Sequence, residues 1–194
     1  MRTAALAALL LLSPCLLVAD DAKKADDHFV SIFDAKTLHG WKVANCEVEV
    51  QDGMIFLKAG NGWMWTEKQY GDFVLELDWK AAKANQYDSG VYIRAVATKP
   101  KQSWPAKNQI NLRQDLMGNI KEIKETVPRL DLVKPGEWNH FRVTVVGTTA
   151  TLEINDKLAW KIDQMKPPTG YIGLQCEVPG GGQFYFRNLR VSER

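Results

Sequence analysis

Short runs in which every second side chain is apolar constrain this chain more than any other feature of its sequence. Such runs cover residues 73–79, 141–145 and 172–176. Successive side chains of an extended strand point to opposite faces, so this period of two predicts strands with one buried face. Turn signals such as Asp52-Gly53 separate the runs. Many short strands with this spacing predict an all-β sandwich of the jelly-roll type.

A single folded domain accounts for most of the chain. The sequence has 194 residues, of which 45% are hydrophobic and 25% are charged, and this composition suits one globular domain. No repeat or linker divides it, so we place the domain at residues 28–192. The net charge is only +2, and cations gather in nothing longer than short pairs such as Lys23-Lys24. Nucleic-acid and membrane-surface partners need clustered cations, so the sequence argues against both.

The N-terminal segment has the features of a secretory signal peptide. Arg2 precedes an apolar run that is interrupted at Ser13-Pro14 and followed by polar residues. The run is too short to span a bilayer, so we expect residues 1–22 to be a signal peptide and the mature protein to be secreted or periplasmic. A lipoprotein signal centred on Cys15 is the alternative, although Pro14 suits that processing poorly.

Two cysteines, Cys46 and Cys176, remain after the predicted signal peptide. In an oxidising compartment they can form a disulfide that closes a long loop. Two small buried thiols are the alternative, because spacing in the sequence does not fix the Cα geometry that a disulfide needs.

Several predicted strands carry an outward row of polar and aromatic side chains that is unusual for a merely solvated sheet. Period two places Tyr92 with Arg94, Gln109 with Asn111 and Arg113, and Gln175 with Glu177. If these strands are neighbours, their amide and guanidinium groups can bind sugar hydroxyls, while aromatic rings cover apolar C–H faces.

Trp104 lies in a loop between Pro100 and Pro105 and is a candidate for stacking on a sugar ring. Trp63 and Trp65 share one strand face, which predicts a packing role.

Eight short motifs follow one another through the chain after the signal segment. They are Ile32-Phe33-Asp34, Leu38-His39-Gly40-Trp41, Val50-Gln51-Asp52-Gly53, Tyr70-Gly71-Asp72-Phe73, Asp88-Ser89-Gly90-Val91-Tyr92-Ile93-Arg94, Gly136-Glu137-Trp138-Asn139, Gly170-Tyr171-Ile172-Gly173-Leu174-Gln175 and Phe186-Arg187-Asn188-Leu189. In this order the set resembles the 3-keto-disaccharide hydrolase family over nearly the whole mature chain. The resemblance implies a concanavalin-like jelly roll of two curved antiparallel sheets. It also implies a substrate that is a glycoside or oligosaccharide oxidised at C3 of a sugar ring.

A ketone at C3 makes the proton at C2 acidic, so the resemblance implies cleavage by elimination of the substituent at C1. This chemistry needs a general base, a group that stabilises the enolate, and an acid or a divalent cation. It does not need the two facing carboxylates of a common glycosidase, and the resemblance implies no other cofactor. The three histidines show no zinc-ligand spacing, so no metal site is predicted.

The family motifs also imply a set of site residues. Arg94 and Gln175 match an arginine and a glutamine of those motifs, and Gln109 lies where the family has a glutamine in a strand. Glu177 and Asp115 are the two carboxylates near the predicted face that could act as the base. The predicted catalytic residues are therefore Arg94, Gln175, Glu177 and Asp115, and the predicted substrate-binding residues are Tyr92, Gln109, Asn111 and Trp104.

Some positions depart from the family pattern. Lys107 and Leu112 stand where acidic residues are expected, and Cys176 and Glu177 follow the Gly-Leu-Gln motif where a histidine is usual. A carbohydrate-binding module that has kept the fold without catalysis is therefore the alternative function. A scaffold domain without a sugar site is a third hypothesis, and it would show no pocket at the polar face.

Overall fold

The computed structural model describes residues 28–194, which fold almost entirely into antiparallel strands. The predicted signal peptide, residues 1–22, lies outside the described residues. The strands are β1 (Val30–Ser31), β2 (Trp41–Gln51), β3 (Met54–Tyr70), β4 (Phe73–Ala81), β5 (Gly90–Ala95), β6 (Gln109–Asn111), β7 (Asn139–Val146), β8 (Thr149–Ile154), β9 (Lys157–Asp163), β10 (Gly170–Glu177) and β11 (Phe184–Glu193). The helical turns in the described part are η1 (Gln114–Leu116), η2 (Leu130–Leu132) and α1 (Val178–Gly181). None of its helices is long and apolar enough to cross a membrane.

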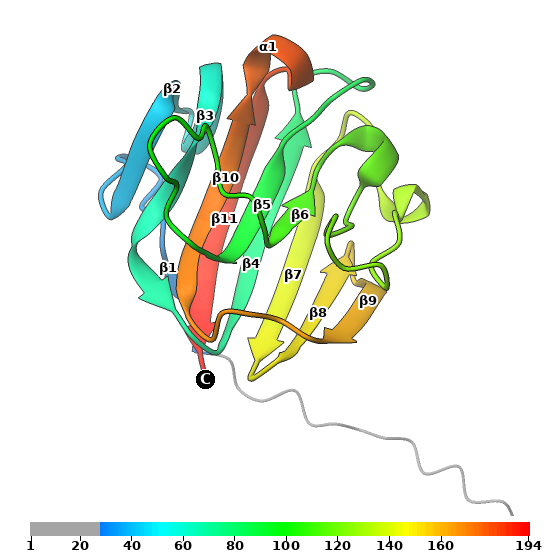
Figure 1. The fold of residues 1–194 in the computed structure, drawn as a ribbon. Helices are drawn as coiled ribbons and strands as arrows, with labels where there is room; N and C mark the ends of the chain where they lie inside the picture. Colours follow the sequence, from blue (N-terminus) through cyan, green and yellow to red (C-terminus); the bar gives the residue numbers. More distant parts are fainter. Residues whose placement is uncertain (1–27) are drawn as a thin grey trace, which may run out of the picture.

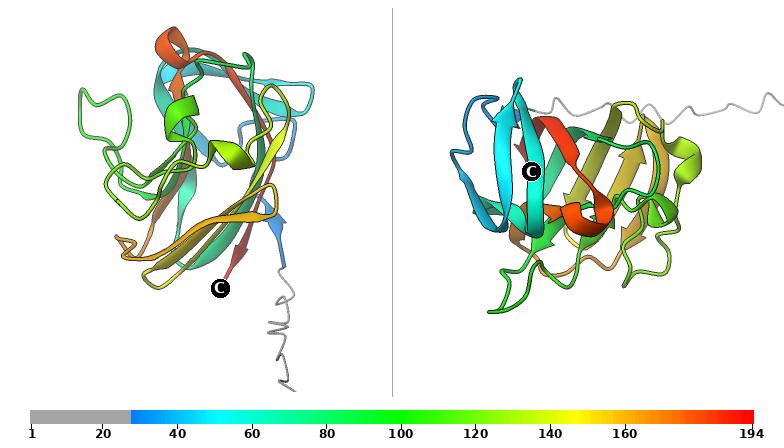
Figure 2. Two further views of the ribbon diagram at one scale, coloured as in Figure 1. Left: turned by 90° about the vertical axis from the view of Figure 1, so that its right-hand side faces the viewer. Right: turned by 90° about the horizontal axis from the view of Figure 1, so that it is seen from above.

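Two curved layers of strands face each other (Figures 1 and 2). The front layer of Figure 1 has the order β6-β5-β10-β3-β2, and the back layer has the order β1-β11-β4-β7-β8-β9. Residues 61–70 of β3 pair with β10, whereas residues 55–57 pair with β11, so this strand belongs to both layers. The arrangement confirms the predicted all-β jelly roll.

The hydrophobic core lies between the two layers. It contains the apolar positions of the alternating runs, which are at most 1% exposed: Phe73, Leu75, Leu77 and Trp79 of β4, Phe141, Val143 and Val145 of β7, and Ile172, Leu174 and Cys176 of β10. Burial of each large apolar side chain contributes about 1.5–3 kcal/mol to folding. The alternation therefore correctly predicted which side of these strands faces the core.

The two cysteines of the mature chain lie on either side of β3. Cys46 pairs with Gly60 of that strand, and Cys176 pairs with Gly62. Both are free thiols, and a hydrogen bond to Cys176, together with burial, raises the pKa of the Cys46 thiol above its usual value. The side chains therefore meet, and a disulfide between them stays a prediction.

The face expected for Arg94 was wrong because β5 contains a bulge. Tyr92 pairs with Gly173 of β10 and Ala95 with Tyr171, so β5 carries one extra residue between them. The bulge is accommodated at Arg94, whose backbone adopts a positive φ of 47°. The strict alternation of sides fails at a bulge, and Arg94 points away from the face that carries Tyr92 and Ala95.

Candidate functional site

A chain of three polar side chains runs across the outer face of the front layer. The amide of Gln109 on β6 donates to the Oε1 atom of Gln175 on β10. Gln175 in turn donates from Nε2 to the Oε2 atom of Glu177, at 2.9 Å. Two neutral amides thus fix the orientation of one carboxylate without neutralising its charge.

Gly90 of β5 makes this chain possible because it lies between the two glutamines. It pairs with Gln175 on one side and with Asn111 on the other. A Cβ atom at this position would lie 2.1 Å from the Nε2 atom of Gln109. The Gln109 side chain therefore crosses β5 only because residue 90 has no side chain.

Beside the polar chain lies a group of three aromatic side chains, Trp63, Trp65 and Tyr92, which we call the aromatic floor. The Trp63 and Trp65 rings stack with centroids 4.4 Å apart, and the Trp63 ring meets Tyr92 edge-on at 5.8 Å. A Cβ atom on Gly173 would lie 2.8 Å from the Trp63 ring, so the indole lies over this glycine. The floor is separate from the main core. Trp63 and Trp65 do pack against each other, as expected for a packing role. They do so outside the main core, however.

Two carboxyl groups near this face have raised pKa values. Burial raises the pKa of Glu177 at the end of β10. Burial and the charge of Glu177 raise the pKa of Asp88, just before β5, to about 6. Carboxyl groups whose pKa is raised towards neutral pH are suited to proton transfer.

A guanidinium group lies within electrostatic reach of both carboxyl groups. The positive charge of Arg113 lowers the pKa of Glu177 and of Asp88, which opposes the effect of burial. Arg113 is held by Asp115 through two bonds, Nε to Oδ1 at 2.5 Å and Nη2 to Oδ2 at 2.6 Å. Asp88, Arg113, Asp115 and Gly180 line a cavity of about 450 Å³.

Comparison with known proteins identifies the family. Residues 28–192 match the profile of the 3-keto-alpha-glucoside-1,2-lyase-like domain, also called the 3-keto-disaccharide hydrolase domain. The chain belongs to this family. Among proteins with curated descriptions, none matches the sequence.

Solved structures with the same fold include carbohydrate-active and carbohydrate-binding proteins. A "putative glycosyl hydrolase" from Parabacteroides distasonis ATCC 8503 is 21% identical, with a TM-score of 0.70, covering 91% of this chain and 98% of that chain. The carbohydrate binding module CBM66 from Bacillus subtilis is 15% identical, with a TM-score of 0.60 and coverage of 79% and 96%. The carbohydrate recognition domain of Emp47p is 12% identical, with a TM-score of 0.58 and coverage of 87% and 96%. At these identities the likeness establishes the fold.

In this 3-keto-disaccharide hydrolase family member, the structure brings together five of the eight predicted site residues. Gln109, Gln175 and Glu177 form the polar chain, Tyr92 belongs to the aromatic floor, and Trp104 packs against the cluster that contains it. Period two along each strand was the signal that identified the first four.

The other three predicted residues have different places. Asp115 lies beside the site, where it binds Arg113. Asn111 is 7% exposed, and its Nδ2 atom donates to the Oδ1 atom of Asn119 at 2.8 Å, so it ties β6 to the following loop.

Arg94 lies outside the site. Its side chain is 1% exposed and donates to the carbonyl oxygens of Gly71 at 2.8 Å and Gly147 at 2.7 Å, and to the carboxylate of Asp72. These partners lie in the β3–β4 and β7–β8 turns, so Arg94 joins the two layers at one end. The enolate-stabilising role expected of Arg94 is corrected to a structural one, because its donors are directed to those turns.

The sequence patterns did not identify Asp88, Arg113 or the aromatic floor as parts of the site. Asp88 is the first residue of the motif that ends at Arg94, but nothing local distinguishes it from a turn residue. Period two places Arg113 on the outward face with Gln109 and Asn111, but nothing in the sequence distinguishes it from a solvated surface charge. Of the described residues, no three His, Cys, Asp or Glu side chains gather as a metal site would require.

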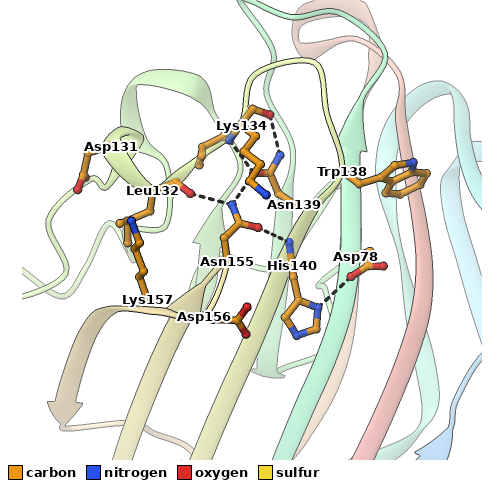
Figure 3. A pocket seen from close by; sticks show the side chains of 11 residues that line it. Asp78, Asp131, Leu132, Lys134, Trp138, Asn139, His140, Asn155, Asp156 and Lys157 are labelled. Atoms are coloured by element: carbon orange, nitrogen blue, oxygen red, sulfur yellow. Dashed lines mark hydrogen bonds and ion pairs between the residues drawn. The ribbon is translucent and has the colours of Figure 1, made fainter.

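A second polar pocket lies on the back layer (Figure 3). His140 Nδ1 lies 2.9 Å from Asp78 Oδ1, and the backbone N–H of His140 donates to Asn155. Asp78 also accepts hydrogen bonds from Arg187 and Asn188 through its other oxygen. This carboxylate is fully engaged by neighbouring donors, so the pocket is a weaker candidate for proton transfer than the front face.

Proposed function

We propose that the protein cleaves 3-keto-glycosides by elimination at its front face. The observation that carries this proposal is a pair of carboxyl groups with raised pKa values within reach of Arg113. They lie beside amide and aromatic side chains that suit a sugar ring. Membership of the family supports the same substrate class.

The proposed reaction assigns one task to each charged group. Glu177 removes the proton from C2 of the keto sugar, and Arg113 stabilises the negative charge that develops on the oxygen at C3. The electron pair then forms the C1–C2 double bond as the C1–O bond breaks, and Asp88 gives its proton to the departing oxygen. Water adding across the double bond would complete a net hydrolysis. Two carboxyl groups in different environments can serve as base and acid in this way.

The supporting residues hold these groups in place. Gln175 donates to Glu177 and so directs its free oxygen, while Asp115 fixes the plane of the Arg113 guanidinium. Such neighbours reduce the reorganisation needed at the moment of reaction.

The proposal is tested with a chromogenic 3-keto-glucoside and the matching unoxidised glucoside. We expect release of the chromophore only from the keto compound, because only its C2 proton is acidic. In D₂O, the sugar product should carry deuterium at C2. Equal cleavage of both compounds would contradict elimination, since ordinary glycoside hydrolysis needs no ketone.

A carbohydrate-binding module is the second candidate function, and one observation favours it. Lys107 and Leu112 stand where the family pattern has acidic residues. Lys107 is exposed and Leu112 is fully buried in the core, so neither position supplies a carboxylate to the site. Calorimetric binding of the keto sugar without any cleavage would support this function and refute the enzyme.

We also propose that residues 1–22 direct export and are removed. The apolar run and the polar residues that follow it support this proposal. Mass spectrometry of the protein from a secreting host should give a mature N-terminus near Ala19 or Ala22. A lipid-modified Cys15 would instead support the lipoprotein alternative.

A further inference from the structure

The aromatic floor holds two buried hydrogen-bond donors that lack partners. Trp63 and Tyr92 are 0% exposed, and neither the Trp63 Nε1 atom nor the Tyr92 hydroxyl has a hydrogen-bond partner among the described residues. Burial raises the pKa of Tyr92, and the charges of Glu177 and Asp88 add to this effect. The hydroxyl is therefore a protonated donor close to the proposed acid and base.

A third unpaired donor shows what distinguishes these two. The Trp79 Nε1 atom is also buried without a partner, but it lies in the main core between Phe141 and Phe184. No ligand can approach it there. Trp63 and Tyr92, by contrast, lie on the outside of the front layer, beside the polar chain.

The loop of residues 96–107 covers the aromatic floor. In Figure 1 it leaves the end of β5, crosses in front of β10 and β3, and returns to β6. Figure 2 shows it projecting from the layers. Trp104, half-buried, packs against the cluster that contains Trp63 and Tyr92.

This loop is fixed at its base and otherwise held by few hydrogen bonds. Asn108 donates from Nδ2 to the carbonyl oxygens of Arg94 and Lys166, at 3.2 and 2.7 Å, and so ties the two ends together. Between these ends, the hydrogen bonds seen in the described chain join only Lys99 with Gln102. Such a segment can open while its base stays in place.

We infer that residues 96–107 are a lid over a sugar subsite, and that the Tyr92 hydroxyl and the Trp63 indole N–H bind oxygen atoms of a pyranose ring once the lid opens. The inference rests on the proposed function, because it deepens the same site. Unpaired buried donors cost free energy in the closed state, and a sugar oxygen removes that cost. Aromatic rings beside them cover the C–H face of the ring.

The first test is Tyr92→Phe, with 1,5-anhydro-3-ketoglucitol as the probe. This compound keeps the ketone but has no leaving group at C1, so binding is measured without cleavage. We expect the variant to bind the probe about five- to tenfold more weakly by calorimetry, because one hydrogen bond is lost. Its thermal midpoint should rise, since the free protein loses an unpaired buried hydroxyl.

Tyr185→Phe is the matched control, because Tyr185 stacks on Phe56 away from the front face. It should leave the affinity unchanged. A structural role for the Tyr92 hydroxyl predicts a lower midpoint, so equal affinity or a lower midpoint in Tyr92→Phe would overturn the assignment of this donor.

The second test is Trp104→Ala, which removes the contact between lid and floor. We expect trypsin to cut after Lys101 at least about tenfold faster, and the probe to associate faster, because opening becomes easier. Trp138→Ala, whose indole stacks on Arg187, is the control. Unchanged proteolysis and association would overturn the lid.

Failure of the inference and failure of the proposed function give different results. Cleavage of the chromogenic substrate with equal probe affinity for wild type and Tyr92→Phe would refute the donor role alone. Probe binding that depends on Tyr92, without cleavage, would support the subsite and refute the enzyme. A wild type that neither binds the probe nor cleaves the chromogenic substrate would overturn both.

Discussion

The outer faces of the two layers carry similar side chains but differ in how their carboxylates are paired. On the back layer, the Glu76 carboxylate accepts hydrogen bonds from Arg142 and Arg190. The Asp78 carboxylate is likewise bonded by three neighbouring side chains, those of His140, Arg187 and Asn188. On the front layer, the neutral amide of Gln175 is the only hydrogen-bond partner that the described residues give to the Glu177 carboxylate. A matched cation satisfies a carboxylate, whereas desolvation without one shifts its pKa. The paired carboxylates of the back face thus stabilise the fold, whereas the Glu177 carboxylate of the front face remains able to react.

The largest difference should appear when one titratable side chain on each face is replaced by glutamine and activity is measured. Glu177→Gln is expected to lower kcat/KM for the chromogenic 3-keto-glucoside by about 10³-fold, because the base is lost while the amide chain can persist. His140→Gln on the back face should change it less than about twofold. Equal losses from both variants would remove the functional distinction between the faces.

The converse experiment measures stability. Glu76 is 6% exposed, and Glu76→Gln removes the carboxylate that Arg142 and Arg190 share. We expect the free energy of unfolding in urea to fall by about 2–3 kcal/mol, below the cost for fully buried pairs because Arg190 is half exposed. Activity per folded molecule should stay at the wild-type level. A Glu177→Gln protein that loses as much stability would contradict the comparison.

A smaller effect is expected from adding one methyl group to the front face. Gly90→Ala places a Cβ atom where the Gln109 amide now lies, so the polar chain must break. We expect kcat/KM to fall about tenfold, because Glu177 loses its fixed orientation. Gln109→Leu should reproduce the loss, which separates broken orientation from damage to β5. Full activity in both variants would show that the chain does not position the base.

The smallest expected effect is a pH dependence of stability that arises at Asp88. Its pKa of about 6 in the folded protein exceeds the ordinary aspartate value of 3.8, so folding favours the protonated form. The stabilisation is complete below about pH 4 and is lost as the pH rises through 6. Between about pH 4 and 7, the thermal midpoint of wild type should fall a few degrees more than that of Asp88→Asn. Parallel curves would show that the Asp88 carboxyl is not desolvated.

Local patterns were enough to predict the strands, their buried sides and part of the site. The period of two is a property of the extended backbone itself, so Gln109, Gln175 and Glu177 could be placed on an outward face from sequence alone. The eight ordered motifs added the family, and with it the jelly roll and the substrate class that we propose. These inferences need only neighbouring residues or a shared order of motifs.

The composition of the site was decided by the tertiary structure. A single extra residue in β5 moved Arg94 from the polar face to the turns between the layers, and no local pattern marks that bulge. Asp88, Arg113 and Glu177 come from separate segments and influence each other's pKa only because β5, β6 and β10 are neighbours. Burial and charge act through space, so the sequence determined which groups are present, while the packing of the layers decided which of them meet.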